Sequence, residues 1–210
     1  MWTERVRSAL QPLSVEKHAV GRMLREWYYT GSTYDLEEPV EDCELCGHQG
    51  IRYQFEIENS HTGHSLLVGS ECITKFDITA VDEAGELLDA DETRHRVRKD
   101  RRKLITDARR RRVINALVQL AHADTEFEIE SFIDYFQDRD AYTPNQLSLL
   151  VWRLKKHRIK YRESDLKMII RRDREKNQLR SMADWKVRQI WPCMSASQKA
   201  WYIDNVGPVR

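Results

Sequence analysis

The stretches CELCGH at 43–48 and VGSEC at 68–72 decide the N-terminal fold of this chain. Cys43 and Cys46 are spaced so that one tight turn presents both sulfur atoms to a single tetrahedral ion. Gly47 relieves the crowding where backbone amides point at the sulfur atoms. Cys72 adds a third thiolate at the expected start of a short helix, where the helix dipole favours the ionised thiol. We therefore predict a half-exposed Zn²⁺ site.

The segment between the cysteines predicts a β-hairpin. Ile51, Tyr53, Phe55 and Ile57 alternate with polar residues, as in a strand with one buried face. The turn falls at 59–63, and 65–68 forms the second strand. A module of this size, over 38–78, has too little apolar core of its own, so bound zinc would contribute directly to its folding.

The fourth zinc ligand is the least defined part of the predicted site. We take His61 as the fourth ligand, with His48, His64 and Cys193 as alternatives. A straight hairpin would hold the turn about 20 Å from Cys43 and Cys46, so His61 requires a bent or shorter hairpin. His48 is close in sequence, and Cys193 would have to arrive by tertiary packing.

The expected role of zinc is structural. Catalytic zinc sites keep a position for water, and zinc deaminases carry an H-x-E pattern ahead of their CxxC. No such pattern precedes Cys43, and the chain has no HExxH, no GxSxG and no glycine-rich phosphate loop. We therefore do not predict an enzyme.

The turn that carries Cys43 and Cys46, the hairpin and the helix start together resemble the treble-clef zinc arrangement. The pattern CxxC…VGSxC is also similar to a module of uncharacterised phage and plasmid proteins. The resemblance covers about 35 residues. It implies a binding role in a mobile-element setting and brings no known activity. The chain departs from the treble clef one turn after Cys72, where Lys75 and Phe76 stand in place of a second ligand.

Composition indicates a folded protein of one or two domains. The chain has 210 residues, of which 40% are hydrophobic, with six Trp and eight Tyr to build a core. No run of eighteen apolar residues predicts a membrane span, and the start MWTER lacks the regions of a signal peptide. We expect a cytoplasmic protein without a membrane partner, in which a CxxC pair marks a metal rather than a disulfide.

The rest of the chain predicts helices, so the expected class is a mostly helical α+β fold. Apolar spacing predicts an N-terminal helix within 1–30, over 15–28, and a helical domain over 93–210 that starts with a long basic helix. Capping patterns predict further helix starts at Thr125, Thr143, Ser181 and Ser195.

The net charge of +1 hides a strong segregation of charge along the chain. Residues 31–92 contain sixteen acidic and two basic residues, and residues 93–112 contain two acidic and eleven basic residues. The segment 113–150 is acidic again, with seven acids against one base, and 151–188 is basic, with fourteen bases against five acids. Two separate segments are therefore candidate sites for an anionic partner.

The two basic segments predict contacts with nucleic-acid phosphates, because guanidinium groups match phosphate oxygens. In the second segment, interleaved aromatic residues also suit unpaired bases. The alternative is that these charges are solvated or neutralised by the acidic block upstream. The predicted contact residues are Arg98, Arg101, Arg102, Arg109, Arg110, Arg112, Lys155, Lys156, Arg158, Arg171 and Arg172.

Two functional hypotheses follow from these patterns. In the first, the protein is a nucleic-acid-binding accessory protein, DNA or RNA, which works within a complex and uses zinc only as a structural ion. In the second, it is a protein-interaction factor, such as an inhibitor or assembly subunit, whose acidic segment docks on a basic partner surface. Binding to nucleic acid at low salt separates the two.

Overall fold

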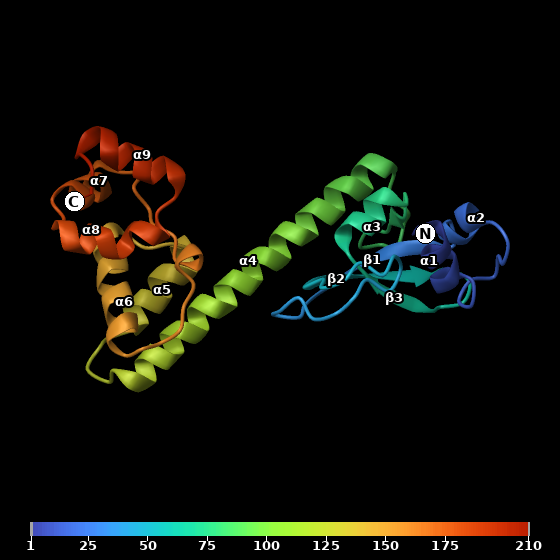
Figure 1. Cartoon of the computed structure of the whole chain (residues 1–210), viewed down its shortest axis with the longest axis horizontal. Helices are drawn as coiled ribbons and strands as arrows, with labels where there is room; N and C mark the ends of the chain where they lie inside the picture. Colours follow the sequence, from blue (N-terminus) through green and yellow to red (C-terminus); the bar gives the residue numbers. More distant parts are fainter. Residues whose placement is uncertain (1, 210) are drawn as a thin grey trace. The chain divides into compact units, whose positions relative to one another are not determined.

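The computed structural model describes residues 2–209, which divide into two compact units (Figure 1). The N-terminal unit ends at Ala108 and the C-terminal unit begins at Arg109. The α+β class, mostly helical with a small sheet, is confirmed. The predicted segments 1–30 and 38–78 lie in one unit, and the unit boundary falls inside the predicted helical domain over 93–210.

A four-stranded sheet with the order β3-β2-β1-β4 organises the N-terminal unit. β2 pairs antiparallel with both β1 and β3, whereas β4 runs parallel to β1. The elements of this unit before the long helix are α1 (Trp2–Leu10), α2 (Val20–Leu24), β1 (Trp27–Asp35), β2 (Tyr53–Asn59), β3 (Ser65–Val68), α3 (Ser70–Lys75) and β4 (Thr79–Ala80).

The predicted hairpin is β2 and β3. Phe55 lies opposite Val68 and Ile57 opposite Leu66, and all four side chains are buried on one face of the sheet. The alternation that predicted this hairpin therefore corresponds to real burial. The short helix that carries Cys72 is also confirmed as α3.

The predicted helix over 15–28 is confirmed only over Val20–Leu24, which is α2, and is wrong on either side of it. The carboxylate of Glu26 accepts hydrogen bonds from the backbone N–H groups of Val15 and Glu16, at 2.8 and 2.7 Å, and holds this stretch as a loop. Ser14 accepts a hydrogen bond from the Trp27 indole instead of capping a helix. From Trp27 the chain is the central strand β1, because its aromatic residues pack into the sheet core.

The predicted long basic helix is α4 (Ala90–Ala123). Its first turns belong to the N-terminal unit, where Val97 is buried and the Tyr29 hydroxyl donates to Asp100 at 3.0 Å. Its last turns belong to the C-terminal unit, where Leu117 and Leu120 are buried in the core. No residue from 98 to 107 is fully buried, so this stretch presents its charges to solvent.

The C-terminal unit is helical. Its core includes Phe136, Tyr142, Leu150 and Leu154, all of which are almost fully buried. Besides the end of α4 it contains α5 (Glu130–Arg139), α6 (Pro144–Lys156), α7 (Asp173–Arg180), α8 (Asp184–Ile190), α9 (Ala196–Asn205) and two 3₁₀ turns, η1 (Glu163–Asp165) and η2 (Trp191–Cys193).

Two of the four predicted helix caps are present. Thr143 caps α6 and Ser195 caps α9, each through a reciprocal bond with a glutamine three residues on. The predicted caps at Thr125 and Ser181 are wrong, because α5 begins at Glu130 after Ile129 and α8 begins at Asp184 after Ala183, both without a side-chain cap. Ser181 instead ends α7.

Candidate metal centre and basic surfaces

Three buried thiols lie close enough together in the N-terminal unit to hold one metal ion. The Sγ atom of Cys72 lies 3.6 Å from that of Cys43 and 3.3 Å from that of Cys46. The three sulfur atoms are within 4.8 Å of one another. Tetrahedral Zn–S bonds of about 2.3 Å would place two sulfur atoms about 3.8 Å apart, so the donor set fits a thiophilic ion.

Local backbone geometry brings these thiols together. Cys43 and Cys46 lie in a tight turn in which the Gly47 amide donates to the Cys43 carbonyl at 2.7 Å and Cys43 donates to the His48 carbonyl at 2.9 Å. Gly47 has a φ of +67°, which favours glycine. Cys72 enters from the first turn of α3, and the Gly69 amide before it donates to the Cys43 sulfur at 3.4 Å.

The thiols share their charge unequally. The hydrogen bond from Cys72, with further bonds from backbone amides such as that of Gly69, lowers the pKa of Cys43 to about 5. The same bond, together with burial, raises the pKa of Cys72. Binding of a metal ion by this cluster would require all three thiols to lose their protons.

His61 is not part of the thiol cluster, so its prediction as fourth ligand is wrong. It lies in the β2–β3 turn, where its amide donates to the Asn59 side chain, and the thiols lie beyond the opposite end of the hairpin. Cys193 is buried in the core of the C-terminal unit, where burial raises its pKa to about 12. His48 and Glu71 line the same 290 Å³ cavity as the three thiols, although neither has a ligand atom within the 4.8 Å cluster.

Several predicted phosphate-binding arginines are engaged inside the C-terminal unit. Arg109 is only 6% exposed, donates to the Asp165 carbonyl at 2.8 Å and forms an ion pair with Asp140. Arg112 binds the Asp165 carboxylate through two hydrogen bonds of 2.7 and 2.9 Å. These contacts fasten α4 to the segments that follow α5 and α6. Arg109 and Arg112 therefore serve the fold, which corrects their predicted role.

Arg110 is both paired within the unit and partly exposed to solvent. Its Nε donates to Asp140 at 2.9 Å, yet its side chain is about half exposed. Asp140 thus forms ion pairs with Arg109, Arg110 and Lys167. Although burial opposes its ionisation, the bond from Arg110 and the charges of Arg109 and Lys167 hold the pKa of Asp140 below its ordinary value.

The other predicted basic residues are on the surface. Arg98, Arg101 and Arg102 lie on the exposed stretch of α4 in the N-terminal unit, and Arg101 also borders the cavity beside the thiols. In the C-terminal unit the exposed members are Lys155, Lys156, Arg158, Arg171 and Arg172. These residues are exposed to solvent, and their contacts with an anionic partner stay a prediction.

Sequence reasoning missed residues that only the tertiary fold brings beside Arg171 and Arg172. Residues 167–169 pair in parallel with Tyr142: its amide donates to the Lys167 carbonyl at 2.9 Å, and its carbonyl accepts from the Ile169 amide at 2.8 Å. This pairing places Lys167 in the wall of a hollow that Arg171 and Arg172 also line. Tyr135 of α5 and Gln178 of α7 line the same hollow. The capping boxes at Thr143 and Ser195 predicted the starts of α6 and α9, but they did not indicate that both helix starts border this hollow.

Comparisons with protein families, with curated proteins and with solved structures find no match to this chain. Among residues 2–209, no helix combines the length and the apolarity needed to cross a membrane.

Proposed function

We propose that this chain is a nucleic-acid-binding accessory protein, in which Zn²⁺ holds the N-terminal unit together and exposed cations of the C-terminal unit contact phosphates. The observation that carries the proposal is the division of charge between the units. The N-terminal unit has twenty-one acidic and fourteen basic residues, a net charge of −7, and the C-terminal unit has thirteen acidic and twenty-one basic residues, a net charge of +8.

Zinc is the proposed ion because three thiolates in a buried turn-and-helix arrangement suit its tetrahedral chemistry. We propose His48 as the fourth ligand in place of His61, because it lines the cavity beside the thiols and follows the turn that carries two of them. A structural zinc ion with four protein ligands contributes its binding energy to folding. Nothing in this role requires the metal to touch the nucleic acid.

The cations that carry the proposed contacts are those left over after internal pairing. Arg109 and Arg112 are engaged with Asp140 and Asp165, but Lys155, Lys156 and Arg158 extend from the end of α6 into solvent. Lys156 also lies 5.3 Å from the ring centre of the exposed Trp152. An exposed ring among cations is a suitable surface for an unpaired base.

The test is a salt titration of binding by the full-length, zinc-loaded protein. Fluorescence anisotropy with labelled mixed-sequence single-stranded and double-stranded oligonucleotides should show binding that weakens steeply as salt rises, because bound cations release counterions from the phosphates. The variant K155Q/K156Q should bind more weakly and reduce the salt slope by about 2. If no oligonucleotide binds at low salt, the proposal fails.

The alternative is a protein-interaction factor that docks through the N-terminal unit. Five acidic residues are exposed in the short segment 37–44, namely Glu37, Glu38, Glu41, Asp42 and Glu44. Such a segment is complementary to a basic protein surface. Loss of a partner from a pull-down when Glu37, Glu38 and Glu41 are changed to Gln, with oligonucleotide binding absent, would favour this alternative.

A further inference from the structure

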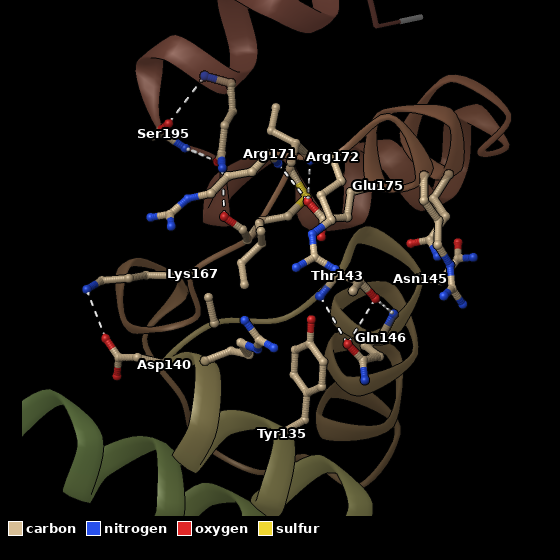
Figure 2. A pocket seen from close by; sticks show the side chains of 18 of the residues that line it. Tyr135, Asp140, Thr143, Asn145, Gln146, Lys167, Arg171, Arg172, Glu175 and Ser195 are labelled. Carbon is tan, nitrogen blue, oxygen red and sulfur yellow. Dashed lines mark hydrogen bonds and ion pairs between the residues drawn. The ribbon is translucent and has the colours of Figure 1, made fainter.

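A hollow of 1110 Å³ opens on the C-terminal unit where several elements converge (Figure 2). Tyr135 of α5 lines it from one side, and Arg171 and Arg172, just before α7, lie across from it. The wall is completed by the starts of α6 and α9 and by residues 167–170. A space of this size is in the range of small-molecule sites in proteins.

The hollow has an excess of positive charge. Five cationic and three acidic residues line it. Within residues 2–209, the guanidinium groups of Arg171, Arg172 and Arg174 have no ion-pair partner. The cationic residues are Arg139, Lys167, Arg171, Arg172 and Arg174.

The three acidic residues in the wall are already engaged. Asp140 binds Arg109, Arg110 and Lys167, and Asp138 pairs with Arg139 at 2.7 Å. The Glu175 carboxylate accepts hydrogen bonds from the backbone amides that precede α7, at 2.6 and 3.0 Å. These acids are therefore not available to neutralise the arginines across the hollow, and an anion from outside can do so.

The two capped helices add to the positive potential of the hollow. α6 starts at Pro144 behind Thr143, and α9 starts at Ala196 behind Ser195, and both starts border the space. A helix N-terminus carries about half a positive charge. Guanidinium groups, an ammonium group and helix starts around one space are the groups that bind phosphate.

Neutral groups in the same wall suit more than a bare phosphate. The Tyr135 ring rises into the hollow with its hydroxyl toward the space, as Figure 2 shows. The side-chain amide of Gln178 lines the same wall. An aromatic ring and an amide that can both donate and accept match the ring and the polar edge of a nucleobase.

We propose that this hollow binds one nucleotide, with its phosphate against Arg171, Arg172 and Lys167 and its base beside Tyr135 and Gln178. The nucleotide comes from a nucleic-acid strand if the function proposed above holds, and the hollow can also take a free mononucleotide of the same chemistry. The inference therefore deepens the proposed function but is separable from it by experiment.

The test compares variants of the full-length, zinc-loaded protein with two probes. The probes are a fluorescein-labelled single-stranded dT12, followed by anisotropy, and a mixture of AMP, CMP, GMP and UMP, followed by calorimetry. R171Q/R172Q should weaken binding of either probe at least tenfold. Tyr135→Leu, which changes no charge, should weaken it about fivefold through lost stacking. K160Q/K186Q is the matched control for charge, because it makes the same charge change at two exposed positions of the same unit that neither line this hollow nor are among the proposed contact residues.

Each outcome decides one of the two proposals. If dT12 binds and R171Q/R172Q loses no more affinity than K160Q/K186Q, with Tyr135→Leu unchanged, the hollow is not the site but nucleic-acid binding stands. If only the mononucleotides bind, and both hollow variants abolish that binding, the hollow stands and the accessory function fails. If neither probe binds, both proposals are overturned. Amide hydrogen exchange of α5 and α7 verifies that each variant is folded.

Discussion

The two units bury their cores by different means. The N-terminal unit packs short helices on a four-stranded sheet, and three of its buried residues are the thiols of Cys43, Cys46 and Cys72. The C-terminal unit has no such cluster among its described residues, and aromatic and aliphatic side chains from five helices and the end of α4 form its core. The first unit is acidic and the second is basic.

This difference places the thiol cluster and the surface that suits phosphate in different units. Arg101 borders the thiol cavity, but most of the exposed acidic residues of the chain belong to this N-terminal unit. Their negative charge would repel a phosphate backbone there. The basic hollow and the cations at the end of α6 are in the other unit. The comparison predicts that metal loss and core damage act on different units.

Loss of a thiol is the change with the largest expected effect. Cys72→Ser should unfold the N-terminal unit and leave the C-terminal unit folded, because zinc binding contributes about 10 kcal/mol or more in small zinc domains, as much as a whole domain's stability. Amide hydrogen exchange followed by mass spectrometry should show lost protection in β1, β2 and α3 but not in α6. Metal analysis of the purified protein should give about one zinc ion per chain.

The matched control is Cys193→Ser, which removes a buried thiol from the other unit. It should retain the metal and cost about 1 kcal/mol through the buried hydroxyl. His48→Ala should lower zinc affinity at least tenfold, whereas His61→Ala should not change it. An N-terminal unit that stays protected in Cys72→Ser would contradict the structural role of the metal.

Damage to the aromatic core should act on the opposite unit. Phe136 is 1% exposed and lies 5.7 Å from Tyr142, ring centre to ring centre. Phe136→Ala should lower the free energy of unfolding of the C-terminal unit by about 3–5 kcal/mol. Hydrogen exchange of the N-terminal unit should not change. Trp185→Ala, at a half-exposed position of the same unit, is the control and should cost less than 1 kcal/mol.

The sequence predicted the parts of the fold in which local pattern and burial agree. The alternation from Tyr53 to Ile57 corresponds to β2, and the unbroken stretch before Ala123 corresponds to α4. It failed over 15–19 and 25–28, where Glu26 binds the backbone amides of Val15 and Glu16 and Trp27 enters a sheet. Contacts of this kind depend on the assembled core and leave no periodic signal.

The candidate sites show the same limit. The spacing of Cys43 and Cys46 predicted the thiol turn, and Cys72 joined it because a helix start is a local feature. Which histidine lies near the thiols depends on which end of the hairpin faces them. Likewise, an arginine run indicates charge but does not show that Arg109 is buried against Asp140 while Arg171 is exposed.

The ion pairs of Asp140 should make the stability of the C-terminal unit depend on pH in the acid range. Its folded pKa is lowered below the ordinary value near 3.8, so the stabilisation is complete above about pH 4 and is lost as the pH falls through the folded pKa. Asp140→Asn should lower stability at neutral pH by about 1–2 kcal/mol and flatten the acid limb of the stability curve. Asparagine suits the position, because Asp140 has a φ of +55°.

Urea unfolding between pH 2 and 7, with exchange read separately for each unit, measures this effect. Asp138→Asn is the control, because Asp138 is exposed and pairs with Arg139 on the surface. It should change stability by less than about 0.5 kcal/mol. An equal loss in the two variants would show that Asp140 contributes no more than a surface charge.

The smallest expected effect distinguishes a cap that forms from one that the sequence only predicted. Thr143 accepts a hydrogen bond from the Gln146 backbone amide, and the Thr143 backbone amide donates one to the Gln146 side-chain oxygen, so Thr143→Ala should cost the C-terminal unit about 1 kcal/mol. Thr125→Ala removes the same hydroxyl from an exposed turn and should cost less than about 0.5 kcal/mol. Thr143→Ser should restore stability because serine keeps the accepting oxygen. Equal losses at the two threonines would mean that the lost methyl group and helix propensity, and not the cap, set the stability of α6.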